Sequence, residues 1–168
     1  HFFLGLTKVQ LRKWEDAADV FNEFLATYSD SPLTPSVLYQ GALSEFMIDR
    51  LEDAVAKVNR IHQEFPGHET APPAWNLKGD LASSLESPPE EIELCYTYGR
   101  DGGIQMQQPD TAAYALWQLL MLTVDQEEWE KAEGHYQQFQ DSYADSDYRN
   151  DLLVAALPML VEQSRTDE

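Results

Sequence analysis

Apolar residues recur at helical spacing in three segments of the chain. Each segment contains an alanine, Ala17, Ala54 or Ala132, with an apolar residue three positions before it and others four, seven and eleven positions after it. These positions share one face of an α-helix, because one turn takes about 3.6 residues. The pattern predicts three amphipathic helices that bury equivalent faces, formed by Trp14, Phe21, Phe24 and Tyr28, by Leu51, Val58, Ile61 and Phe65, and by Trp129, Tyr136, Phe139 and Tyr143.

The regular spacing of these segments indicates an internal repeat. Ala54 lies 37 residues after Ala17, and Ala132 lies 78 residues after Ala54, so one further copy is expected between the last two. A degenerate copy fits there, with Glu91 at the alanine position and Cys95, Tyr98 and Gly102 at the later ones. Cys95 is therefore expected to be a small buried apolar residue rather than a nucleophile.

A second helix is predicted before each of the last three copies, over 35–48, 72–85 and 111–124. No stretch alternates apolar and polar residues as a strand would. The helix starts are predicted from capping residues: Thr34 and Asp110 as N-caps, capping-box spacing in Asp49 with Glu52, Ser87 with Glu90 and Asp125 with Glu128, and Pro88 at the first helical position.

The chain is thus predicted to be all-α, built from helical hairpins. A last helix, from 148 to 163, is expected to cover the end of the stack, with a kink or the start of a new turn at Pro158.

The repeat resembles the tetratricopeptide repeat (TPR), a helical hairpin with a small residue in each helix and a terminal proline. Gly5, Ala42 and Gly79 take the small position of the first helix, helix A, and Pro66 is the terminal proline of the second unit. Endings such as 24–32 resemble bacterial envelope-associated members. The chain departs from the family pattern at Ser29 and Ala144, which replace the proline, and at Leu120, which replaces the small helix-A residue.

The resemblance implies a right-handed α-solenoid that forms one domain. Its units would be 1–33, which is truncated, 34–70, 71–109, which is degenerate, and 110–146, followed by the capping helix 147–164.

The charge of the chain restricts its partners. Eleven basic against thirty acidic residues give a net charge of −19, which disfavours nucleic acid and anionic membrane surfaces. Residues 110–147 hold one basic and nine acidic residues, so partners steered by charge are expected to approach there with basic segments. No apolar run is long enough to span a bilayer.

No catalytic or metal-binding constellation is present in the sequence. The acidic cluster 125–130 suits a helix N-terminus, where carboxylates face the positive end of the helix dipole. His62 and His68 have no further ligands at metal spacing. The segment 98–109 breaks the repeat, with a turn predicted at 101–103, and is equally consistent with a functional insertion and with harmless degeneration. We therefore expect no cofactor, no metal and no enzymatic activity.

The resemblance places a partner-binding groove on exposed helix-A positions. Residue by residue these are Phe2, Leu6 and Val9; Tyr39, Leu43 and Phe46; Asn76, Asp80 and Ser83; Trp117, Met121 and Val124. None of them is Lys or Arg, so the family's clamp for a peptide carboxylate is not expected. The alternative interpretation is that the apolar members pack on neighbouring helices or on a segment outside the given sequence.

Two functions follow from these observations. The first is a non-enzymatic scaffold that binds a partner protein or peptide in the helix-A groove, in the bacterial periplasm or envelope rather than the cytoplasm. The alternative is a structural spacer or oligomerisation segment of a longer solenoid, whose groove is filled by its own chain and which self-associates.

Overall fold

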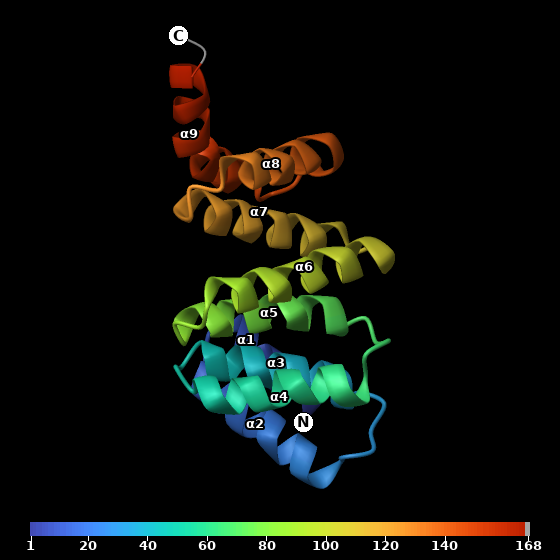
Figure 1. The fold of residues 1–168 in the computed structure, drawn as a ribbon. Helices are drawn as coiled ribbons and strands as arrows, with labels where there is room; N and C mark the ends of the chain where they lie inside the picture. Colours follow the sequence, from blue (N-terminus) through green and yellow to red (C-terminus); the bar gives the residue numbers. More distant parts are fainter. Residues whose placement is uncertain (167–168) are drawn as a thin grey trace. The chain divides into compact units, whose positions relative to one another are not determined.

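The computed structural model describes the backbone of residues 1–166 and the side chains of residues 1–164. Over this range the chain is all-α, as predicted, and contains no strand. It divides into two compact units, His1–Ser87 and Pro88–Glu168. The helices are α1 (Phe2–Gln10), α2 (Trp14–Thr27), α3 (Thr34–Phe46), α4 (Leu51–Glu64) and α5 (Ala71–Ser84) in the first unit, and α6 (Pro89–Gln105), α7 (Pro109–Asp125), α8 (Trp129–Tyr143) and α9 (Arg149–Thr166) in the second (Figure 1).

Within each unit, helices that follow one another in sequence pack together, which gives an all-α solenoid of TPR-like hairpins. In the first unit α2 contacts α1 and α3, and α4 contacts α3 and α5. In the second unit α7 is central and contacts α6, α8 and α9. The division falls between α5 and α6, inside the segment predicted as the third hairpin. Whether residues 1–168 act as one domain stays a prediction.

Small residues lie where helices approach most closely. Ala17, Ala54 and Ala132 are fully buried, as the repeat predicts. Gly5 of α1 faces Phe21 of α2, and a methyl group on Gly5 would lie 2.3 Å from Cε1 of that ring. The first hairpin therefore closes only because position 5 has no side chain.

We expect Gly5→Ala to lower the free energy of unfolding by about 2 kcal/mol, because the buried Phe21 ring must shift to admit the methyl group. Gly134→Ala is the matched control, since a methyl group there meets nothing within 4 Å. It should stabilise the protein by about 0.5–1 kcal/mol through helix propensity. Urea denaturation followed by circular dichroism measures both, and equal effects of the two substitutions would contradict the close packing.

The short connections between helices all use one backbone conformation. Arg12, Asp49, Glu86, Gln107 and Glu127 have φ between 53° and 61°. At Asp49, the next amide, of Arg50, donates to the carbonyl of Glu45, and the Asp49 amide donates to that of Phe46. Such a left-handed residue after a helix is the Schellman type of C-terminal cap.

The predicted N-terminal caps are wrong for this reason. No N-cap side chain of α1 to α8 makes a capping hydrogen bond, and the N-cap residues of α4 and α8 are Arg50 and Glu128. The left-handed residue ends one helix and the next begins at once, so Asp49 and Asp125 lie too early to cap. The other predicted caps are displaced as well: Thr34 is the first residue of α3, Asp110 is the second of α7, Ser87 precedes the cap and Pro88 is the N-cap of α6.

Asp49→Gly should raise the free energy of unfolding by about 0.5–1 kcal/mol, because glycine adopts positive φ without the steric cost of a Cβ atom. Asp53→Gly, at an exposed position in the first turn of α4, should lower it by about 0.5–1 kcal/mol, through weaker helix propensity and the loss of a carboxylate near the positive end of the helix dipole. Thermal melts of the two variants provide the comparison. Destabilisation of both by the same amount would show that the turn conformation is not decisive.

The segment predicted to be irregular is helical. α6 runs from Pro89 to Gln105 and includes the predicted turn at 101–103. Four of its buried positions, Ile92, Tyr96, Gly99 and Gly103, reproduce the repeat offsets one residue later than predicted, whereas Glu91 and Tyr98 are exposed. Cys95 is buried as expected.

Glycines made this copy hard to detect. A methyl group on Gly103 would lie 2.9 Å from the backbone nitrogen of Ala112, so α6 and α7 meet backbone to backbone. The bulky residue expected late in the repeat is therefore absent.

Three other expectations change slightly. Tyr28 is exposed and Phe65 is half-buried, because each is the C-cap of its helix and leaves the helical face. α9 continues through Pro158 as one helix, so no new turn starts there, and the kink stays a prediction.

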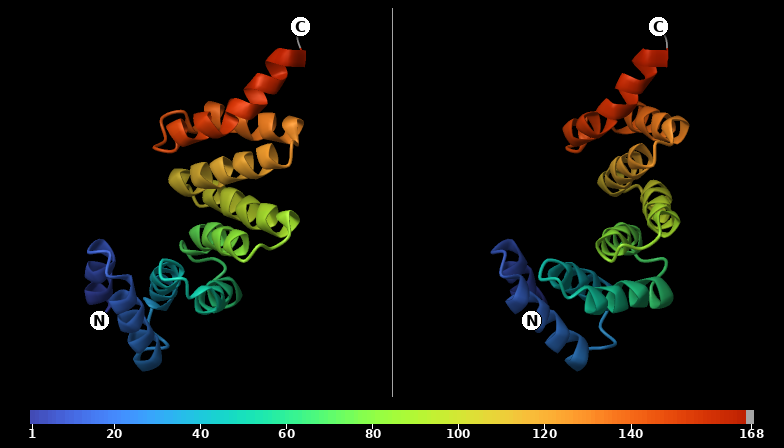
Figure 2. Two further views of the ribbon diagram at one scale, coloured as in Figure 1. Left: turned by 90° about the vertical axis from the view of Figure 1, so that its left-hand side faces the viewer. Right: turned by 60° about the vertical axis from the view of Figure 1, so that its left-hand side comes forward.

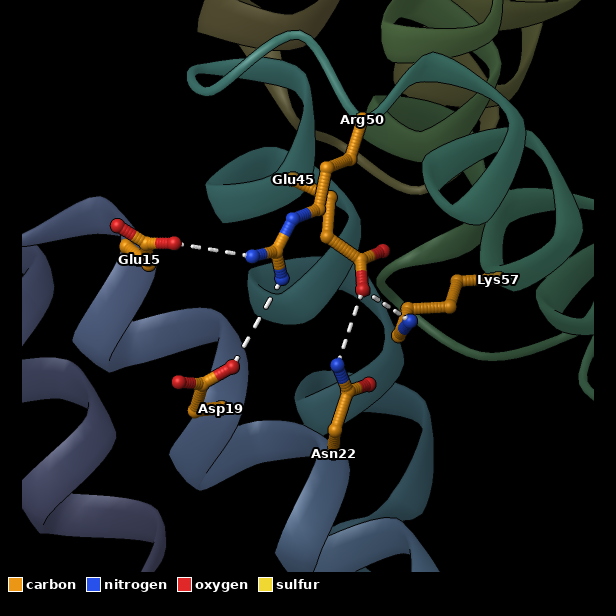
Figure 3. A network of polar contacts seen from close by, with 6 residues as sticks. All are labelled: Glu15, Asp19, Asn22, Glu45, Arg50 and Lys57. Atoms are coloured by element: carbon orange, nitrogen blue, oxygen red, sulfur yellow. Dashed lines mark hydrogen bonds and ion pairs between the residues drawn. The ribbon is translucent and has the colours of Figure 1, made fainter.

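A polar network joins α2, α3 and α4 of the first unit (Figure 3). Glu45 of α3 is 1% exposed and pairs with Nζ of Lys57 at 2.6 Å, with Nδ2 of Asn22 donating to the same oxygen at 3.1 Å. The other oxygen, Oε2, is buried and accepts no hydrogen bond. Arg50 pairs at the surface with Glu15 and Asp19. The network fixes the register of three helices around one buried charge.

Candidate functional site

A groove lies between α7 and α9 in the second unit. Its volume is about 390 Å³ and most of its surface is apolar. Helix α7 contributes Trp117, Met121, Val124 and Asp125, spaced three or four residues apart on one face, and α9 contributes Asp151, Val154, Ala155 and Pro158 in the same way. Three predicted groove residues, Trp117, Met121 and Val124, thus lie together.

Trp117 is held in place by neighbouring aromatic rings. Its ring stacks on Tyr148 with centroids 5.6 Å apart, and Tyr114 meets both rings edge to face. Trp117 also packs against the core shared by α7, α8 and α9. An aromatic side chain fixed in advance loses little freedom when a partner binds, which suits it to an anchor position.

The ends of the groove are acidic. Asp125 is the last residue of α7 and Asp151 lies in the first turn of α9, and both are exposed. Among the described residues that line the groove, none is basic. The site therefore offers an apolar floor between two carboxylates.

The other predicted groove residues lie in the first unit, far from Trp117 and Met121 in sequence. Phe2, Leu6 and Val9 pack against the core around Phe21, and Tyr39, Leu43 and Phe46 pack against the core of α3, α4 and α5, all half-buried. Asn76 is buried, Asp80 is half-buried and Ser83 is exposed. A partner on α5 would therefore meet Ser83 and Asp80 before Asn76.

The histidines occupy structural positions. His62 stacks on Trp75 with ring centroids 3.8 Å apart, and burial lowers its pKa to about 4. Burial also lowers the pKa of His135 to about 4, with Arg100 and Lys131 acting in the same direction. Nδ1 of His62 and Nε2 of His135 are buried and make no hydrogen bond. In the part of the chain whose side chains are described, no group of three potential ligands could hold a metal ion.

The model of the YfiO family, described as outer membrane lipoprotein, matches residues 2–157. The chain belongs to this family. No curated protein sequence matches it significantly.

Membership in the YfiO family confirms the predicted TPR-like, envelope-associated character and favours the bacterial envelope over the cytoplasm. YfiO proteins are non-enzymatic scaffolds that bind other proteins. No helix within the described residues of this YfiO chain has the length and apolar character needed to cross a membrane.

Sequence reasoning missed the α9 side of the site in this YfiO chain. The last helix was assigned to cover the end of the stack, and its buried face, Leu152, Ala156 and Met159, does so. Asp151, Val154 and Pro158 share a different face of the same helix. The spacing of Val154 and Pro158, four residues apart, was the available signal for a second apolar face, with Asp151 at its end.

Lowering the pH from 7 to 5 is expected to reduce the free energy of unfolding by about 1 kcal/mol for each of His62 and His135, after allowing for their partial exposure. The unfolded histidines take up protons near pH 6.5, whereas the folded ones do so only near pH 4. The unfolded state therefore binds more protons between these values, and stability falls as the pH falls. Urea midpoints of the wild type and of His62→Gln/His135→Gln at both pH values test this, because parallel profiles would exclude a contribution from the histidines.

Proposed function

We propose that the chain is a non-enzymatic scaffold that binds a partner protein or peptide segment through its helix-A faces, in the context of outer-membrane assembly. The observation that carries the proposal is the apolar groove between α7 and α9, with Trp117 and Met121 in its wall. In the first unit, Tyr39, Leu43 and Phe46 form a second candidate surface, together with Phe2, Leu6 and Asp80. The family supports protein binding in general.

The chemistry of the groove supports a protein ligand over a metabolite. Aromatic and apolar side chains around a fixed tryptophan are the usual composition of an interaction hot spot. A metabolite site would need several converging polar groups, whereas the polar side chains that line this groove are two aspartates at its ends.

Site-specific photo-crosslinking in cells tests the proposal. A photoreactive amino acid at Met121 or Val154 should capture a partner of defined mass, whereas the same residue at Glu133, an exposed position of α8 outside the groove, should not. Identical products at all three positions would contradict the groove as the site. Crosslinks confined to the chain itself or to a second copy would favour the spacer or oligomerisation alternative.

A further inference from the structure

We propose that the groove between α7 and α9 binds an amphipathic helix with basic residues at the edge of its apolar face. This inference rests on the proposed function and specifies the partner of the same site. Three features of the second unit carry it: the apolar outer face of α9, the separation of two helices by an open groove, and the sign of the charges at the groove ends.

α9 is apolar on more than its buried face. Leu152, Ala156 and Met159 are buried against α7 and α8, yet Val154, Leu157 and Val161 are 68%, 55% and 50% exposed. These three residues are spaced three and four apart, so they form a stripe along one side of the helix. A helix that is apolar around most of its circumference is normally covered on both sides.

The stripe adjoins the groove. Val154 belongs to both, and Met121, which is 40% exposed, forms the opposite wall on α7. The last turns of α9 extend beyond α7 and α8 (Figure 2). A partner helix in the groove would pack on α7 and α9 at once and cover the stripe. Its side chains would interdigitate with those of both helices, at the usual distance of about 8–10 Å between helix axes. An extended segment would have no sheet edge to pair with, because the described residues form no strand.

The charges select a basic partner. Asp125 and Asp151 line the groove and no basic residue does so among the described lining residues. A second copy of this chain brings a net charge of −19 to the same surface and would be repelled. Lys or Arg side chains at the border of an apolar helix face could pair with both carboxylates while their stems cover the groove walls.

Fluorescence anisotropy with two labelled peptides tests the inference on the full chain. The first is an amphipathic helix of Leu and Lys about four turns long, and the second has Glu in place of every Lys. We expect the Lys peptide to bind and the Glu peptide to bind at least tenfold more weakly. Val154→Asn, which removes apolar surface at a 68% exposed position without adding a charge, should weaken binding of the Lys peptide by about tenfold.

Neutralising pairs of aspartates distinguishes ion pairs at the groove from a general attraction between the acidic chain and a basic peptide. Asp125→Asn/Asp151→Asn should lower the affinity for the Lys peptide by about fivefold, through the loss of two exposed ion pairs. Asp141→Asn/Asp145→Asn removes the same net charge at exposed positions outside the groove and should leave the affinity within about twofold. Equal losses in the two double variants would overturn the inference, as would equal binding of both peptides or of neither.

The two proposals fail in different ways. Crosslinking at Met121 to a partner segment that is acidic or not helical would overturn the basic-helix inference and leave the scaffold function intact. Sedimentation that shows a dimer abolished by Val154→Asn would make a second copy the occupant and would also overturn it. Absence of both crosslinked partners and peptide binding would remove both proposals.

Discussion

Phe139→Ala is expected to lower the free energy of unfolding by about 3–5 kcal/mol, the largest effect of any single truncation proposed for this chain. The Phe139 side chain is fully buried and packs in the cluster that joins α7, α8 and α9, which includes Leu116, Leu120 and Leu152. Removing the ring leaves a cavity between these helices. The helices could fill the cavity only by moving and so losing other contacts. Equilibrium unfolding in urea measures the loss.

Tyr28→Ala is the control for the loss of an aromatic ring from the repeat. Tyr28 occupies a repeat position but is exposed at the end of α2, so its truncation should cost less than about 1 kcal/mol. A small effect of Phe139→Ala, close to that of Tyr28→Ala, would contradict the central role of α8 in the core of the second unit.

The binding site depends on the same core. α9 contacts α7 and α8 through Leu152, Ala156 and Met159, and these contacts hold Val154 and Pro158 opposite Met121. Phe139→Ala should therefore weaken binding of the Lys peptide even under conditions in which most molecules stay folded.

Lys57→Met is expected to lower the free energy of unfolding by about 3–5 kcal/mol, because it leaves the Glu45 carboxylate buried without a countercharge. Glu45 is 1% exposed and the Lys57 side chain 13%, and Asn22 would be the remaining partner (Figure 3). Methionine keeps the stem that packs over Gly41, so the loss reports the charge rather than the packing.

A double variant shows whether the Glu45–Lys57 ion pair stabilises the fold or only offsets the cost of burying its two charges. Glu45→Met/Lys57→Met should recover most of the lost stability, because removing both charges also removes the cost of burying them. Arg50→Met is the surface control: its pairs with Glu15 and Asp19 are solvent-exposed, so the loss should stay below about 1 kcal/mol. A double variant as unstable as Lys57→Met would show that the pair itself stabilises the fold. Thermal and urea unfolding of the wild type and these three variants provide the comparison.

The apolar pattern alone was sufficient for the helices and the repeat. Burial of Ala17, Phe21, Ala54, Val58, Ala132 and Phe139 follows from spacing, because every apolar residue at i, i+4 and i+7 must share a face of any helix that contains it. Trp117 and Met121 were placed on one face of one helix by the same argument and line one groove. Local periodicity is a property of the chain, so the sequence determines it without knowledge of the fold.

Features that depend on two helices at once were decided by the tertiary structure. The register of α6 was predicted one residue too early, because two of its buried positions, Gly99 and Gly103, have no side chain and so leave no apolar signal. Gly103 instead lies close to the backbone of Ala112. Most of the capping residues were misplaced because each short turn is closed by a left-handed residue, a conformation that Arg12, Asp49 and Glu127 adopt under the constraint of packed neighbours.

The groove and its charges are likewise tertiary. Sequence places Asp125 and Asp151 far apart and gives α9 no role beyond covering the stack, yet packing of α9 on α7 brings both carboxylates to one apolar site. The sequence by itself thus determined an acidic, all-α, TPR-like chain of the envelope-associated type. The packing of the helices alone decided which helix faces stay exposed and which side chains meet in the groove. The exposure of a residue depends on its neighbours in the fold and not on the residue itself.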